Sequence, residues 1–204
     1  MTARTRRRAW HAPAAIAAAA VLAVAALAVA VGALAAPGHP AGPKFPGLAP
    51  AAAPADWRHL TLPNGAAVLS YPPTLHPAPG DTDAVTAVRL SPSGTFQLYL
   101  NATPRQGSEN LRNWAAFRLS LLRADDAATA HQVAAAHGVR FRGGTGSCVI
   151  DTYLTRIGHH HYQEIACLAQ GRTSGSVIVA AAPAAQWAKA SPVLFRAVAA
   201  YQVR

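Results

Sequence analysis

An uncharged apolar run near the N-terminus constrains this chain more than any other feature of its sequence. All 23 residues from 14 to 36 are Ala, Val, Leu, Ile or Gly. A helix of about 20 such residues crosses the hydrocarbon core of a bilayer, because each residue adds about 1.5 Å. The sequence therefore predicts a basic cytoplasmic segment at residues 1–13, a transmembrane or signal helix at residues 14–36, and a separate domain beyond it.

The charges that flank the run predict its orientation. Arginines at positions 4, 6, 7 and 8 precede it, and positive flanks stay on the cytoplasmic side. We therefore expect the rest of the chain to lie outside the cytoplasm. The length of the run favours an uncleaved single-pass anchor in the cell membrane. Ala33-Leu34-Ala35 matches the A-x-A pattern of signal cleavage, so secretion after cleavage near Ala35 stays an open alternative.

A change of composition separates the apolar run from the domain. Residues 37–56 are rich in Pro, Gly and Ala and have no apolar period, which predicts an extended, semi-rigid linker. Residues 57–204 then form a stretch of about 150 residues, a common size for one globular domain.

Within this domain, alternating apolar positions and turn residues predict three β-hairpins. Asn64-Gly65 joins the strands of the first hairpin, and such a dipeptide is a strong hairpin signal. The strands are expected at residues 57–62 and 66–71, 84–90 and 95–102, and 147–156 and 161–169.

Helical signals occupy the segments between and after these hairpins. They predict one helix opening at Ser108, with Glu109 at its positive end, and a second at Asp125–His137 ending at Gly138. A strand at residues 176–182 and a helix opening at Ser191-Pro192 follow. This order predicts an α+β fold, a mostly antiparallel sheet with helices packed on it.

Five segments of the domain carry a family resemblance: residues 69–73 (LSYPP), Asn113-Trp114, residues 143–148 (GGTGSC), residues 162–164 (YQE) and residues 177–183 (VIVAAAP) with the closing helix. With these segments, the domain resembles the PsbP-like family. The resemblance covers roughly Trp57 to the C-terminus and implies an α/β/α sandwich, a fold found in exported and lumenal proteins. The family is accessory rather than enzymatic, so the resemblance implies a non-catalytic role. The excess of Ala, Arg, Gly and Pro indicates a high-GC bacterial genome.

The two cysteines, Cys148 and Cys167, lie on the two strands of the third hairpin. If its turn centres between residues 157 and 158, facing residues have numbers that sum to 315. Cys148 then opposes Cys167, and Ile150 opposes Ile165 on the same face. Because the leader sends both thiols to an oxidising compartment, we expect a structural disulfide.

Three charged residues are the candidate site. Arg118 falls in the middle of the apolar arc of the first helix, where a charge must pair or reach solvent. It is either a structural ion pair or a contact for an anion or a partner. Asp151 and Glu164 can face each other across the third hairpin as an acid pair.

Other features argue against several functions. On a strand, His159–His161 point to alternating faces and cannot all ligate one ion without a distorted turn. Gly143–Gly146 lacks the Lys-Ser/Thr ending of a phosphate loop. We therefore expect no metal and no cofactor. Of the formal net charge of +10, five positive charges precede Trp57. The domain itself has 13 basic and 7 acidic residues, or +6, scattered without clustering, so we expect no nucleic-acid binding.

Together these features predict a non-catalytic binding or accessory domain, tethered outside the bacterial membrane. Its expected partner is an unknown envelope protein or a small ligand. The alternative is a hydrolase-like enzyme that uses the carboxylates and histidines of the third hairpin.

Overall fold

The computed structural model describes residues 45–204. The predicted cytoplasmic segment 1–13 and membrane segment 14–36 lie outside the described residues. Among residues 45–204, the helices fall short of the length and apolarity needed to span a bilayer.

Two β-sheets and two α-helices make up the domain, which is therefore α+β as the sequence predicts. The small sheet has the order β1-β2-β10, and the large sheet has the order β3-β4-β5-β9-β8-β7-β6. In chain order the elements are β1 Arg58–Thr61, β2 Ala67–Tyr71, β3 His76–Ala78, β4 Val85–Leu90, β5 Phe96–Pro104, α1 Trp114–Asp125, β6 Ala127–Phe141, β7 Gly144–Thr155, β8 His161–Gln170, β9 Gly175–Pro183, the short 3-10 turn η1 Ala184–Gln186, α2 Trp187–Ala200 and β10 Gln202–Val203.

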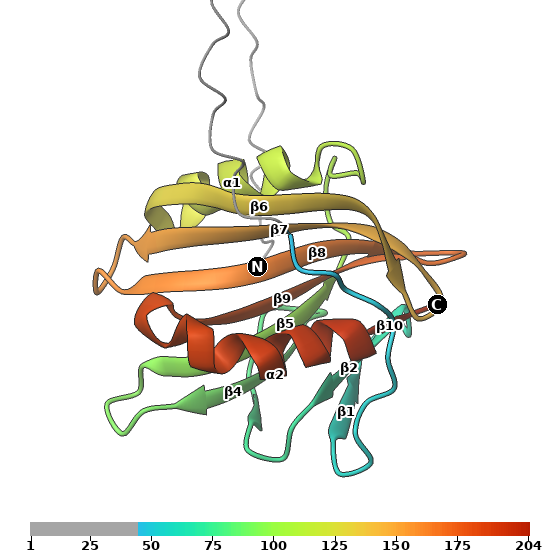
Figure 1. Cartoon of the computed structure of the whole chain (residues 1–204), viewed down its shortest axis with the longest axis horizontal. Helices are drawn as coiled ribbons and strands as arrows, with labels where there is room; N and C mark the ends of the chain where they lie inside the picture. Colours follow the sequence, from blue (N-terminus) through green and yellow to red (C-terminus); the bar gives the residue numbers. More distant parts are fainter. Residues whose placement is uncertain (1–44) are drawn as a thin grey trace, which may run out of the picture. The chain divides into compact units, whose positions relative to one another are not determined.

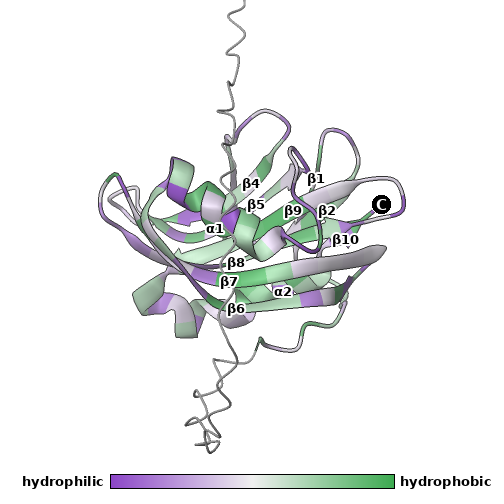
Figure 2. Ribbon diagram, turned by 90° about the horizontal axis from the view of Figure 1, so that it is seen from above, coloured by the Kyte–Doolittle hydropathy of each residue, from purple (hydrophilic) through white to green (hydrophobic). Residues whose placement is uncertain are grey.

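The large sheet separates two layers of packing (Figure 1). Helix α1 covers one face, which we call the α1 face, and helix α2 and the small sheet cover the other. Its strands carry long hydrophobic stretches (Figure 2). The larger apolar core joins α2 and β2 to the sheet, and Leu69, Ile165, Ile178, Leu194 and Tyr201 are among its fully buried members. A smaller core under α1 contains Trp114, Leu119, Val149, Leu168 and Val179.

Part of the predicted linker is packed rather than free. Residues 45–56 form no helix or strand, as their Pro-rich composition suggests. However, Phe45, Leu48 and Ala53 pack against the larger core, and the Ala51 N–H donates to the Ala199 carbonyl at 2.9 Å. The apolar packing of the domain therefore begins before Trp57.

The prediction of a helix at Asp125–His137 is wrong. Asp125 ends α1, and the segment from Ala127 onward belongs to β6, an edge strand of the large sheet. Gly138, expected to end that helix, has a positive φ of 67° and lies at an irregularity of the β6–β7 ladder. A glycine at a bulge supplies the backbone conformation that the kinked strand requires.

The first helix begins later than predicted. Its N-cap is Asn113 rather than Ser108, because the side chains of Asn110 and Asn113 bind backbone N–H groups of the preceding loop. Such side-chain bonds compete with helical backbone bonds. Glu109 therefore lies in the loop before α1, where it is 4% exposed and accepts from the Gln106 N–H at 2.8 Å.

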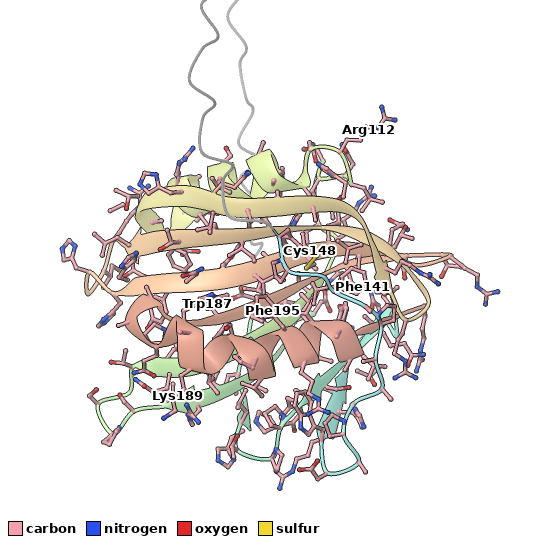
Figure 3. The ribbon with its side chains drawn as sticks, viewed as in Figure 1. Arg112, Phe141, Cys148, Trp187, Lys189 and Phe195 are labelled. Carbon is pink, nitrogen blue, oxygen red and sulfur yellow. A yellow bond between two sulfur atoms is a disulfide. The ribbon has the colours of Figure 1, made fainter. Side chains whose placement is uncertain are left out.

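The last helix begins earlier than predicted. Helix α2 starts at Trp187, directly after η1, and Pro192 lies inside it instead of opening it at Ser191-Pro192. Trp187 contacts Phe195 edge to face, with ring centroids 5.8 Å apart, and Figure 3 shows both side chains beside α2. This contact packs the first residue of α2 against a ring two turns further along the same helix.

Candidate functional site

The third hairpin has the register that the sequence predicts. Cys148 pairs with Cys167, Ile150 with Ile165, and Asp151 with Glu164. The two cysteines form a disulfide with their Cα atoms 4.1 Å apart, and both are buried. Cys148 lies near the centre of the large sheet in Figure 3. The bridge faces the larger core, so it joins the adjacent strands β7 and β8 from inside the domain.

Because side chains alternate along a strand, Asp151 and Glu164 point to the opposite side of the sheet, toward α1. The ladder pairings continue this row across four strands, from Asp151 to Glu164, Ala181 and Tyr99. Ala181, whose side chain is a single methyl group, stands between Glu164 and Tyr99 in this row. The row therefore places two carboxylates and a phenol beneath one helix.

Helix α1 supplies the cation of this cluster. The Arg118 Nε–H donates to Glu164 Oε1 at 2.7 Å, and the Arg118 side chain is 15% exposed. Arg118 therefore points from α1 toward the sheet, and its charge is paired with that of Glu164. A buried charge without such a partner costs several kcal/mol.

Both carboxylates are sealed from solvent. Asp151 and Glu164 have no measurable exposure, and both Asp151 oxygens and Glu164 Oε2 lack a hydrogen-bond partner among the described residues. Burial, reinforced by the negative charge of Glu164 and opposed by Arg118, raises the pKa of Asp151 far above its usual range. Burial by itself lowers the pKa of Arg118, but the facing Glu164 carboxylate raises it overall.

Aromatic rings surround the charged cluster. Tyr153 and Tyr162 are cross-strand partners with ring centroids 5.9 Å apart, and Phe96 contacts Tyr99 edge to face at 5.3 Å. Burial raises the pKa of Tyr153 and of Tyr99, so both phenols stay neutral at physiological pH. Sequence reasoning missed these rings, although 153 and 162 also sum to 315 and their pairing was available from the predicted register.

The histidines of the third hairpin do not join the carboxylates. His159 and His160 lie exposed in the turn, and His161 begins β8, where its Nε2 lies 2.6 Å from Thr152 Oγ1. Within residues 45–204, no group of three or more His, Cys, Asp or Glu side chains is arranged to hold a metal ion.

Another histidine, His137 on β6, makes a contact that the sequence did not suggest. His137 Nδ1 lies 3.0 Å from Ser147 Oγ and 2.9 Å from the Leu111 carbonyl. Ser147 is buried and donates to that same carbonyl. The pair therefore fastens the loop before α1 to the sheet, and the serine oxygen is not free to attack a substrate.

Comparison with known proteins identifies similar structures at low sequence identity. CyanoP, the PsbP protein of the cyanobacterium Synechocystis, is 11% identical with a TM-score of 0.49 over 74% of this chain and 95% of its own. Protein PA94 of Pseudomonas aeruginosa, of unknown function, is 10% identical with a TM-score of 0.45 over 70% and 94%.

A Bacteroides thetaiotaomicron structure is 11% identical with a TM-score of 0.46 over 73% of this chain. The matched region spans about half of that protein, 49% of its length. No family model and no curated protein matches the sequence. Similarities of this size do not assign the chain to a family.

Proposed function

We propose that this chain is an exported bacterial protein whose domain acts outside the cytoplasm as a non-catalytic binding or accessory domain. The buried Cys148–Cys167 disulfide is the observation that carries the proposal. Disulfides persist in oxidising compartments and are rare in the cytosol. The apolar run at residues 14–36, preceded by four arginines, supplies the means of export and, if uncleaved, the tether to the membrane.

The role of the charged cluster supports binding rather than catalysis. A general acid or base must reach a substrate, whereas Asp151 and Glu164 are enclosed between α1 and the sheet. The hydrolase-like alternative needs these carboxylates near a histidine and open to solvent. Arg118 binds Glu164 instead of an external anion, so its role here is structural.

The expected binding partner is another envelope protein, and one end of the large sheet is the surface that we propose it contacts. The β4–β5 and β7–β8 turns lie at this end. Leu90 and Phe96 flank the first turn and are 48% and 41% exposed, and Ile157 in the second is 90% exposed. Exposed apolar and aromatic side chains are typical of protein interfaces, which is why we propose this end of the sheet as the contact surface.

Two experiments test whether the chain is exported and whether its leader is cleaved. A reporter enzyme fused after Arg204 should be active only outside the cytoplasm, and activity inside intact cells would refute export. Mass spectrometry of the mature N-terminus then separates the two kinds of leader. A peptide beginning at Ala36 means cleavage, and an intact N-terminus means an anchor.

A photo-crosslinking amino acid at Ile157 should capture a defined envelope protein in living cells. The matched control is Thr173, which is exposed in the β8–β9 turn at the opposite end of the sheet. Equal capture at both positions, or capture at neither, would contradict the proposed contact surface.

A further inference from the structure

The charges enclosed between α1 and the sheet do not balance when all of them are ionised. Arg118 contributes one positive charge, and Asp151 and Glu164 contribute two negative charges. The other basic residue of α1, Arg123, is engaged elsewhere, because it donates to the Ala130 carbonyl at 2.6 Å. The remaining polar groups facing the pair are the phenols of Tyr99 and Tyr153 and, from β6, the neutral Gln132 opposite Asp151.

The positions of the two carboxylates allow them to share a proton. Asp151 and Glu164 are directly opposed on β7 and β8, and such residues have Cβ atoms about 4.5–5.5 Å apart, a spacing at which two carboxyl groups on the same face can reach each other. Glu164 uses Oε1 for Arg118 and leaves Oε2 free as an acceptor. Asp151 has no other partner for either oxygen among the described residues.

We propose that Asp151 and Glu164 hold one proton between them at neutral pH, and that this proton keeps α1 docked on the sheet. Asp151 carries the proton and donates it to Glu164 Oε2, while Glu164 Oε1 accepts from Arg118. The enclosed cluster then has no net charge, and Glu164 Oε2 acquires a donor. Loss of the proton leaves one net negative charge enclosed, with two carboxylates side by side.

The response to pH follows from the raised pKa of Asp151. In the unfolded chain this carboxyl is ionised above about pH 4, whereas in the folded chain it keeps its proton to much higher pH. The unfolded state therefore binds fewer protons across this interval. The free energy of unfolding falls as the pH rises toward the folded-state pKa, and the equilibrium constant for unfolding rises by up to about tenfold per pH unit.

The loss of stability at rising pH should appear first at the contact between α1 and the sheet. Glu164 and Arg118 link β8 to the middle of α1, and the enclosed charge forms directly beneath this link. Alkaline pH should therefore loosen α1, with faster hydrogen exchange of its amides, before the disulfide-linked strands open.

The test compares the full-length chain, purified in mild detergent, with its Asp151→Asn variant. Asparagine can donate to Glu164 but cannot ionise, so the variant should unfold with a midpoint that is nearly constant from pH 6 to pH 9. The wild-type midpoint should fall over the same interval. The matched control is Asp126→Asn, which removes an exposed carboxyl at the end of α1 and should keep the wild-type slope.

Infrared spectroscopy supplies a readout that a purely structural role would not move. A protonated carboxylic acid has a C=O stretching band that a carboxylate lacks. Wild-type protein at pH 7 should show this band, and Asp151→Asn should lose it even if the variant is less stable. Absence of the band from folded wild-type protein, or equal pH slopes for wild type and Asp151→Asn, would overturn the proposal.

Discussion

The sulfur atoms of Cys148 and Cys167 are bonded across two adjacent strands of a seven-stranded sheet, at positions directly opposed in the β7–β8 ladder. Intact-mass analysis of exported protein, denatured with an alkylating agent and without reductant, should therefore find no free thiol. The same analysis after reduction should find two. Two alkylatable thiols without reductant would show that the bridge does not form in the cell.

Removing the bridge should lower stability moderately. The cysteines are 19 positions apart, and closing a loop of that size stabilises by about 3 kcal/mol in the chain-entropy model, less if the hairpin persists in the unfolded chain. Thermal unfolding of Cys148→Ala/Cys167→Ala should thus show a lower midpoint than the oxidised wild type. A variant as stable as the oxidised protein would mean that the neighbouring strands already hold the hairpin together.

The Arg118→Ala substitution should be far more damaging than Arg112→Ala. Arg118 neutralises a carboxylate with no solvent exposure, and breaking one partner of a buried pair costs about 3–5 kcal/mol. Arg112 is exposed and projects away from the domain (Figure 3), so its removal should change stability by less than about 0.5 kcal/mol. Chemical denaturation of both variants measures the difference, and equal losses would contradict the assigned role of Arg118.

The strand register and the face of α1 could be predicted because their signals are local. The turn of the third hairpin fixes the sum 315, and one register then places Cys148, Asp151 and their partners. The azimuth of Arg118 follows from helix geometry alone. In contrast, the pairing of Arg118 with Glu164 joins residues 46 positions apart, and it depends on where α1 lies over the sheet.

The error at β6 also has a physical cause. Irregularities in the β6–β7 ladder interrupt the two-residue alternation between Ala127 and Thr129, and again between Gln132 and Ala134. Its buried residues therefore include Ala127, Ala130 and Ala134, with spacings of three and four that imitate a helix. Alanine also has a high helix propensity, so the composition and the spacing of the buried residues both indicated a helix where the structure has a strand.

The Trp114→Phe substitution tests the other attachment of α1. The Trp114 Nε1–H donates to the Ala166 carbonyl at 2.9 Å in a fully buried contact. Phenylalanine keeps most of the apolar packing but loses the donor, so we expect a loss of about 1–3 kcal/mol. The control is Trp187→Phe, because Trp187 is only partly buried and contacts Phe195 through its ring. An equal or larger loss at Trp187, measured by chemical denaturation, would contradict this assignment.

Gly143 lies where the β6–β7 turn meets the C-terminal strand β10. The Val203 N–H donates to the Arg142 carbonyl at 2.9 Å, and Arg142 also forms a bridge with Gln202, so this turn joins the large sheet to the small one. Gly143 has a φ of 87°, and a Cβ atom there would lie 2.0 Å from the Val203 carbonyl oxygen. That oxygen belongs to the backbone and cannot move aside without opening the junction.

Gly143→Ala should therefore destabilise the domain by more than a positive φ alone explains. The matched control is Gly94→Ala, since Gly94 has a φ of 82° but open space around the site of a Cβ atom. We expect about 1–2 kcal/mol for Gly94→Ala, the usual cost of a left-handed conformation for a residue with a Cβ atom. The loss for Gly143→Ala should exceed it, because the collision with Val203 adds to the same backbone penalty. Chemical denaturation of the two variants measures how much stability the collision with Val203 removes. Equal losses would show that the junction between the sheets rearranges without loss of stability.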